Sequence, residues 1–170
     1  MLKAAVALVI LSAAAAGQDV ASSKVASSKN ETKHLTVTTS ASPEAAGPGK
    51  RVSLAVNVAP KPTMHVYAPG QAGYIAIALT LDADPAFISG KATYPAGEKI
   101  LIKALNETQT VYAKPFRIVQ DLTLRPRSGE AAASTLTVRG TLRYQACDDR
   151  ICYLPVSVPL AWTIPLAAKR

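Results

Sequence analysis

The chain has 170 residues, of which 49% are hydrophobic and 18% are charged, and its formal net charge is +8. This length suits one domain with a hydrophobic core rather than two. The basic residues are scattered or terminal, without the dense run interleaved with aromatics that a nucleic-acid surface requires, so we expect no nucleic-acid partner. A solvated basic surface explains the charge best, and attraction to an acidic partner or an anionic membrane is the alternative.

The N-terminus has the pattern of a secretory signal peptide. Lys3 supplies a positive charge, residues 4–11 form a short apolar run, and Ala14–Ala16 provide an A-x-A cleavage site. The run is too short for a permanent anchor, and no later stretch approaches the ~20 apolar residues of a membrane helix. We therefore predict a signal peptide over residues 1–16 and an exported mature chain without a transmembrane segment.

Composition sets the other domain boundaries. Residues 17–33 are rich in Ser, Ala and Lys and bury too little apolar surface to offset the entropy of ordering, which predicts a flexible leader. The folded domain is predicted over residues 34–166, beginning at His34. Residues 167–170 form a short basic tail.

Within the predicted domain, apolar residues alternate with a period of two, and helical periodicity is nearly absent. The alternating positions are Val52, Leu54, Val56 and Val58; Ile75, Ile77, Leu79 and Leu81; Leu122 and Leu124; Leu136 and Val138; Leu142, Tyr144 and Ala146; and Val156, Val158, Leu160, Trp162 and Ile164. Several short strands of this kind predict an all-β domain, an immunoglobulin-like two-sheet sandwich rather than a closed barrel. Pro159 within the last run indicates an edge strand or a bulge, and we expect Trp162 in the core.

The chain has two cysteines, Cys147 and Cys152, with four residues between them. In an exported protein they can form a structural disulfide, but closing so short a ring stabilises by only roughly 2 kcal/mol, against over about 4 kcal/mol for one joining distant strands. A pair at the solvent-facing tip of two strands is better placed for exchange, which needs one reachable thiolate and a second thiol to resolve the mixed disulfide. Asp148 and Asp149 disfavour a thiolate and Arg150 favours it. Spacing alone leaves both interpretations open.

The surrounding residues resemble a known redox hairpin. Residues 144–155 read Tyr-Gln-Ala-Cys-Asp-Asp-Arg-Ile-Cys-Tyr-Leu-Pro, which is similar to the active-site hairpin of the N-terminal periplasmic domain in the family of the transmembrane thiol reductase DsbD. The matching positions are Tyr144, Gln145, Cys147, Cys152, Tyr153 and Pro155. The loop between the cysteines is one residue shorter than in the best-known members, which can alter the reduction potential. Leu154 stands where the first of two prolines is common.

Two further segments support this resemblance. Residues 64–70 are similar to a family segment that sends alternate aromatic side chains toward the cysteines, and His65 and Tyr67 occupy those positions. Residues 93–97, 105–108 and 111–112 are similar to the family's cap loop, which shields the sulfurs until a partner lifts it. The aromatic expected in the cap is missing, and Leu105 is the nearest candidate for its place. The resemblance covers about residues 50–164.

The resemblance implies a thiol–disulfide oxidoreductase without a cofactor or metal. Family members accept electrons from a thioredoxin-like domain, which a membrane thiol relay reduces, and pass them to exported thiol proteins such as disulfide isomerases and cytochrome c maturation factors. By resemblance, Cys152 forms the mixed disulfide and Cys147 resolves it. The implied surroundings of the pair are His65, Tyr67, Leu105, Tyr144, Gln145, Asp148, Asp149, Tyr153 and Pro155. We expect a periplasmic monomer whose relay and thioredoxin-like partner are separate polypeptides.

Several alternatives stay open at this point. The chain could be an exported immunoglobulin-like binding module with an inert disulfide. His34 and His65 could complete a zinc or copper site with the cysteines, although an oxidising compartment favours the disulfide. His65 could assist proton transfer or be an ordinary surface histidine. The tyrosines at 67, 144 and 153 could wall the site or belong to the core.

Overall fold

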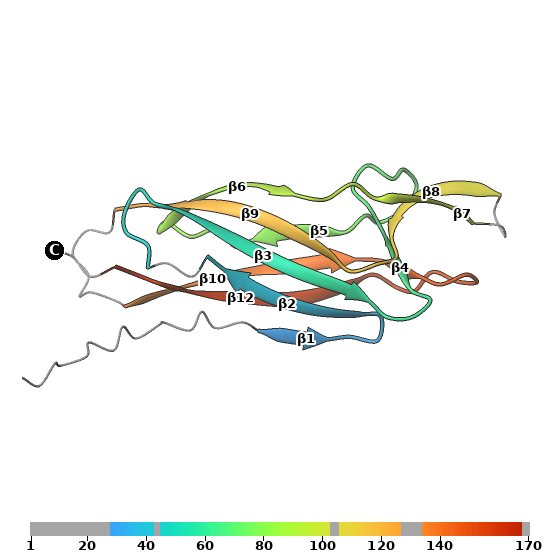
Figure 1. Cartoon of the computed structure of the whole chain (residues 1–170), viewed down its shortest axis with the longest axis horizontal. Helices are drawn as coiled ribbons and strands as arrows, with labels where there is room; N and C mark the ends of the chain where they lie inside the picture. The colour runs from blue at the N-terminus through green and yellow to red at the C-terminus, as the bar shows by residue number, and fades with distance from the viewer. Residues whose placement is uncertain (1–27, 43–44, 103–105, 127–133, 168–170) are drawn as a thin grey trace, which may run out of the picture.

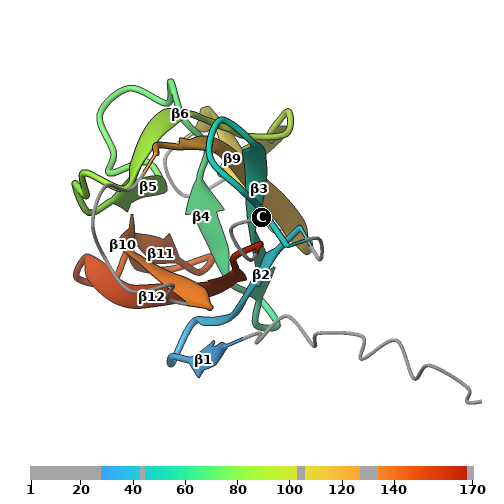
Figure 2. The same ribbon diagram turned by 90° about the vertical axis from the view of Figure 1, so that its left-hand side faces the viewer.

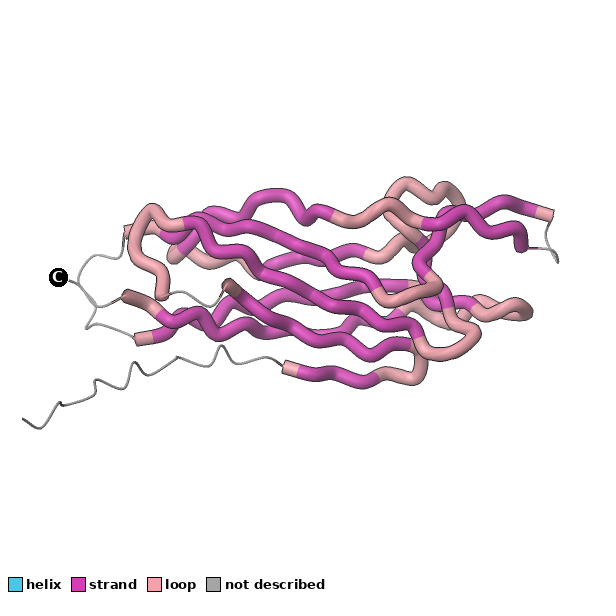
Figure 3. The backbone as a smooth tube through the Cα atoms, viewed as in Figure 1, coloured by secondary structure: helices cyan, strands magenta, loops and turns pink. Residues whose placement is uncertain are grey.

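The computed structural model describes residues 28–42, 45–102, 106–126 and 134–167. These ranges form strands joined by turns (Figure 1), and Figure 3 shows strands along most of the described chain. The strands are β1 (Lys29–Glu31), β2 (Leu35–Ala41), β3 (Arg51–Pro60), β4 (His65–Tyr67), β5 (Ala78–Leu81), β6 (Phe87–Thr93), β7 (Glu98–Ile102), β8 (Glu107–Tyr112), β9 (Phe116–Leu124), β10 (Thr135–Tyr144), β11 (Ala146–Cys147) and β12 (Val156–Pro165). None of the described ranges contains a helix long and apolar enough to cross a bilayer.

Two antiparallel sheets face each other along the length of the molecule. One has the strand order β1-β2-β3-β9-β6 and the other the order β12-β10-β5. Figure 2 shows β10 and β12 across the molecule from β3 and β9. The predicted all-β, two-sheet sandwich is confirmed.

The core lies between these two sheets, and the period-two alternation explains which side chains enter it. In β3, Val52, Leu54 and Val56 are at most 1% exposed. Trp162 of β12 is also 1% exposed, as expected, and its Nε1 donates to the carbonyl oxygen of Ala55 across the sandwich at 3.1 Å. A buried indole N–H needs such an acceptor, so this bond ties the two sheets at a defined point.

β12 is an edge strand of its sheet, which confirms the indication from Pro159. Pro159 lies opposite Thr141 of β10 and has no N–H to offer a further strand. The other side of β12 is covered by side chains from the first sheet. Thr39 of β2 donates its hydroxyl to the carbonyl of Ala161 at 2.9 Å.

The folded structure begins earlier than predicted. β1 lies within the expected leader but pairs with β2 in register Lys29↔Thr38, so the boundary at His34 is wrong. The reason is a turn closed by Thr32, whose hydroxyl oxygen accepts the N–H of Leu35 at 2.9 Å. The predicted signal peptide, most of the leader and residues 168–170 of the tail lie outside the described residues.

A third sheet, with order β11-β4-β8-β7, was not predicted. It lies at one end of the sandwich, where the β7–β8 hairpin and the turn after β11 project together (Figure 1). The strand expected over residues 75–81 forms only at Ala78–Leu81, because the backbone of Ile77 bonds instead to the carbonyl of Tyr67 at 2.9 Å. This short sheet positions the cysteines.

Gly140 of β10 lies between two strands of the second sheet, paired with Leu160 on one side and Leu81 on the other. A Cβ there would lie 2.6 Å from the carbonyl oxygen of Thr80. We predict that Gly140→Ala lowers the free energy of unfolding by about 1–3 kcal/mol through overpacking, measured by guanidinium denaturation. In Gly47→Ala, where the new Cβ has no neighbour within 4 Å, the change should stay below about 1 kcal/mol. Equal effects would contradict this packing.

Candidate redox site

Cys147 and Cys152 lie directly opposite each other across a tight hairpin and form a disulfide. Their Cα atoms are 4.0 Å apart. The N–H of Tyr153 donates to the carbonyl of Ala146 at 2.8 Å, one residue below the pair. The cysteines therefore occupy a non-hydrogen-bonded position of an antiparallel ladder, where facing side chains come closest.

Asp148 shapes the turn between the sulfurs. Its Oδ1 accepts the backbone N–H groups of Arg150 and Ile151, both at 2.8 Å, and its Oδ2 accepts the hydroxyl of Tyr153 at 2.8 Å. The bonds from Ile151, Arg150 and Tyr153, in that order of effect, hold the pKa of Asp148 below its ordinary value. This carboxylate therefore stabilises the turn through three accepted hydrogen bonds.

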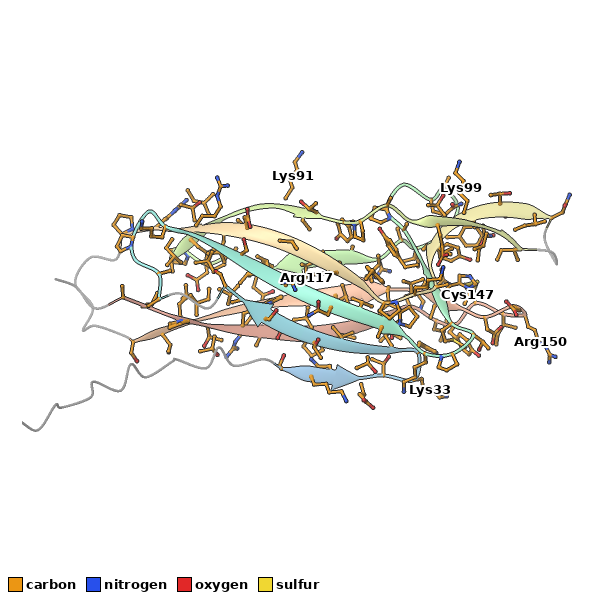
Figure 4. The ribbon with its side chains drawn as sticks, viewed as in Figure 1. Lys33, Lys91, Lys99, Arg117, Cys147 and Arg150 are labelled. Atoms are coloured by element: carbon orange, nitrogen blue, oxygen red, sulfur yellow. A yellow bond between two sulfur atoms is a disulfide. The ribbon has the colours of Figure 1, made fainter. Side chains whose placement is uncertain are left out.

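The two cysteines differ sharply in exposure. Cys147 is 1% exposed because β11 pairs with β4, which places it opposite His65, whereas Cys152 is exposed. In Figure 4, Cys147 lies beside β4 and Arg150 marks the projecting tip of the turn. Both cysteines were expected from the sequence to face solvent. This is correct for Cys152 and wrong for Cys147.

A pocket of about 230 Å³ opens onto the disulfide. It is lined by His65 and Tyr67 of β4, Ile102 of β7, Gln109 of β8, and the hairpin residues Cys147, Asp148, Asp149, Arg150, Ile151 and Cys152. Each of these elements comes from a different part of the chain, and the third sheet brings them together. Asp149 and Arg150 stand exposed at its rim.

Tyr67 contacts both sulfurs. Its hydroxyl oxygen lies 3.2 Å from Sγ of Cys147 and 3.4 Å from Sγ of Cys152. Because disulfide sulfurs carry no hydrogen, the hydroxyl is the donor. Burial raises the pKa of Tyr67 to about 12, with smaller contributions from Tyr74 and Glu107, so the donor keeps its proton at any physiological pH.

A polar network behind Tyr67 was not predicted. The ring of Tyr74 stacks on Tyr67 with centroids 4.2 Å apart, and the Tyr74 hydroxyl donates to Oε2 of Glu107 at 3.0 Å. Gln109 donates to the same oxygen at 3.3 Å. Gln109 reaches the pocket only because β8 pairs with β4. The sequence gives no sign of this contact, since a single polar residue in a short strand has no distinguishing pattern.

His65 is 4% exposed, so the interpretation as a surface histidine is wrong. Its ring meets that of Tyr67 edge-on, with centroids 5.9 Å apart. Burial lowers the pKa of His65, and the negative charges of Asp149 and Asp148 oppose this only in part. The neutral imidazole therefore predominates near neutral pH.

His34, which was expected at the start of the folded domain, is buried. It packs on Tyr153 with ring centroids 4.5 Å apart and meets Tyr144 edge-on at 6.3 Å, so it supports the base of the hairpin and is not among the residues that line the pocket. Among the described residues, no group of three or more His, Cys, Asp or Glu side chains is arranged to hold a metal.

The remaining predicted site residues are divided between core, hairpin and surface. Tyr144 is 0% exposed and belongs to the core, with its hydroxyl bonded to Thr32 at 2.8 Å. Gln145 donates to the carbonyl of Tyr153 at 3.1 Å across the hairpin. Pro155 is exposed, and Leu105 lies outside the described residues.

Comparison with known proteins identifies the family. The family described as "Thiol:disulfide interchange protein DsbD, N-terminal" matches residues 31–159. The chain belongs to the DsbD N-terminal family. The immunoglobulin-like sandwich expected for this family agrees with the all-β structure. No curated protein matches the chain.

Two solved structures resemble this member of the DsbD N-terminal family at a distance. One is the N-terminal periplasmic domain of ScsB from Proteus mirabilis, with 14% identity, a TM-score of 0.49, and coverage of 79% of this chain but 47% of that one. The other is the N-terminal domain of DsbD from Neisseria meningitidis in its reduced form, with 18% identity, a TM-score of 0.43, and coverage of 64% of this chain and 74% of that one. The chain thus spans about half the length of the ScsB domain.

The segment that resembles the family's cap loop contributes a hairpin, β7–β8, to the third sheet. β7 and β8 pair in register Glu98↔Val111 through Ile102↔Glu107, and β8 pairs with β4 beside Tyr67. Ile102 and Gln109 on this hairpin line the pocket. The β7–β8 hairpin is therefore an extension of the sheet that contains β11 and Cys147.

We predict that Tyr67→Phe slows reduction of the disulfide by dithiothreitol. The departing thiolate loses a hydrogen bond to a charged group, worth about 1.5–3 kcal/mol, so the rate at pH 7 should fall by roughly tenfold or more, measured by stopped-flow fluorescence. Tyr74→Phe keeps an aromatic ring in the stack and removes no contact with sulfur, and it should change the rate much less. An unchanged rate in Tyr67→Phe would rule out this role.

Proposed function

We propose that the chain is a periplasmic carrier of electrons between thiol proteins, working through Cys147 and Cys152. Membership of the DsbD N-terminal family implies thiol–disulfide exchange in general. The observation that carries the finer proposal is the asymmetry of the pair, with Cys152 exposed and Cys147 1% exposed. A sulfur at an exposed residue can be approached in line by another protein, and the buried one cannot.

The proposed cycle transfers two electrons without a cofactor. A donor thiolate attacks Sγ of Cys152, the bond to Cys147 breaks, and Cys147 leaves as a thiolate. The donor's second thiol then resolves the mixed disulfide, so that the donor becomes oxidised and the pair becomes a dithiol. In the onward step, the Cys152 thiolate attacks the acceptor's disulfide, and Cys147 attacks Cys152, which releases the reduced acceptor and re-forms the bond.

The proposed partners follow from the family. The donor is a thioredoxin-like protein supplied by a membrane thiol relay, and the acceptors are exported thiol proteins such as disulfide isomerases or cytochrome c maturation factors. All of these act as separate polypeptides in the proposal. The periplasm is the proposed compartment because the N-terminal sequence has the pattern of a signal peptide.

The alternative, an inert disulfide in a binding module, is less well supported by the packing. Trp162, Leu54 and Leu142, at most 1% exposed, belong to the main core between the two large sheets. Cys147 instead belongs to a separate small cluster with Tyr67 and Val111. A bond at this place closes only a turn, so it constrains the unfolded chain little.

Trapping in exporting cells tests the proposal. We expect Cys147→Ala to accumulate mixed disulfides through Cys152, because the resolving thiol is gone, and we expect Cys152→Ala to accumulate few, because Cys147 is buried. Non-reducing electrophoresis followed by mass spectrometry measures both. Trapping mainly through Cys147 would reverse the assignment, and trapping through neither cysteine would contradict the carrier function.

Exposed apolar side chains occur at the end of the molecule that carries the disulfide. Four large hydrophobic residues are exposed among the described residues, and three of them lie at the disulfide end: Leu101 (56%) on β7, and Ile151 (56%) and Leu154 (86%) on or just after the cysteine hairpin. A protein whose sulfur reaches Cys152 must cover neighbouring hairpin residues. We propose that Ile151 and Leu154 supply apolar contact to that partner.

Leu154→Ser should slow reduction of the disulfide by a protein partner but not by a small thiol. We predict that reduction by a thioredoxin slows by roughly tenfold, equivalent to about 1.4 kcal/mol of lost contact, whereas reduction by dithiothreitol is unchanged. Ile88 is 55% exposed on β6, a strand of the five-stranded sheet and not of the sheet that contains the start of the cysteine hairpin, so Ile88→Ser is the matched control and should affect neither rate. Equal thioredoxin rates in the two variants would contradict the proposed contact.

A further inference from the structure

His65 is a buried polar group that the exchange cycle above does not use. It is 4% exposed, and its Nε2 is buried without a hydrogen-bond partner among the described residues. An unpaired polar atom of this kind costs free energy in a folded protein and calls for an explanation. His65 also lines the pocket that contains both cysteines.

Strand pairing places His65 against the buried sulfur. His65 and Tyr67 are two residues apart on β4 and so share one face, while Cys147 is the direct cross-strand neighbour of His65. Side chains in this relation have Cβ atoms about 5 Å apart. The opposite face of the pair, with Val66 and Ala146, belongs to the main core.

We propose that His65 accepts the proton of the Cys147 thiol when that thiol resolves the mixed disulfide. This inference rests on the proposed function, because it assigns a base to its second step. The Cys147 S–H proton passes to His65 Nε2, and the resulting thiolate attacks Sγ of Cys152. The bond from Cys152 to the partner breaks, the partner leaves as a thiolate, and the protonated imidazole then gives up its proton to water or to that thiolate.

The other groups around the pocket are unsuited to this task. Tyr67 keeps its proton because its pKa is raised to about 12, so it can form a hydrogen bond with the sulfurs but cannot act as the base that removes a thiol proton near neutral pH. The Asp148 carboxylate already accepts three hydrogen bonds within the turn. Asp149 and Arg150 are exposed at the rim, and β7 and β8 contribute Ile102 and Gln109, which do not titrate.

Burial of Cys147 explains why a base is needed. A thiolate in an apolar site is costly unless a positive or hydrogen-bonding partner faces it. Tyr67 supplies one hydrogen bond, and protonated His65 would supply the compensating charge at the moment the thiolate forms. Burial keeps the pKa of His65 below its ordinary value, so the imidazole is free to accept a proton at pH 7.

A chromogenic aromatic disulfide, dithiobis(nitrobenzoate), separates the two steps on the reduced full chain. Attack by Cys152 releases a first thionitrobenzoate, and resolution by Cys147 releases a second. Because thionitrobenzoate leaves as a stable anion, the second phase reports deprotonation of Cys147. We expect His65→Gln to slow the second phase at pH 7 by about tenfold or more and to leave the first phase within about twofold.

The pH profile gives a readout that a purely structural role would not produce. The wild-type second phase should fall only below the titration of a histidine with a lowered pKa, whereas in His65→Gln it should follow a thiol, whose ordinary pKa is about 8.5. Added imidazole should restore the second phase in His65→Ala. His34→Gln is the matched control, because His34 is also buried but does not line the pocket.

The outcomes distinguish this inference from the function on which it rests. Two phases with an unchanged second phase in His65→Gln, or a wild-type profile that follows a thiol, would overturn the role of His65 and leave the carrier function standing. A reduced wild-type chain that releases no thionitrobenzoate would overturn the carrier function itself. If His65→Gln does not fold, imidazole rescue of His65→Ala and the wild-type profile still decide the question.

Discussion

The pairing of β11 with β4 is the constraint on which the site depends. Two backbone pairs, Ala146↔Val66 and Cys147↔His65, turn the start of the cysteine hairpin into part of a sheet. The consequence is that one cysteine is packed beneath the neighbouring strands while the other remains at the edge of the turn. A symmetrical, fully exposed hairpin would offer a partner two equivalent sulfurs, whereas here Cys147 is buried and Cys152 is exposed; in the proposed cycle the exposed cysteine meets the partner and the buried one resolves the mixed disulfide.

The main hydrophobic core and the disulfide lie in different parts of the fold. The two large sheets bury Leu54, Leu142 and Trp162, and no bond between cysteines is needed to close that core. The small third sheet lies at one end of these two sheets and contains Cys147, His65 and Tyr67. Its strands are held by backbone hydrogen bonds, and the turn by the Asp148 carboxylate. Opening the disulfide therefore removes one short cross-strand link and leaves the ladder on either side in place.

Much of the frame could be predicted from sequence, because alternation of apolar residues reports directly which face of a strand is buried. It identified Val52–Val58 and Val156–Ile164, and Pro159 marked the edge. The cysteine hairpin was recognisable from its residues. The burial of Cys147 and His65 could not be predicted, because it depends on the pairing of β4 with β11. These two strands are too short to show an alternation of apolar and polar residues. Likewise, Tyr74 and Gln109 reach the site only through tertiary packing.

The most direct test of the account is the equilibrium of the Cys147–Cys152 bond against glutathione. An electron carrier must exchange with both its donor and its acceptor proteins, so we predict a midpoint potential clearly more oxidising than about −300 mV. The measurement requires only the purified chain, a series of glutathione ratios and acid quenching with thiol alkylation. A midpoint far below about −300 mV would mean an inert structural bond and would contradict the account.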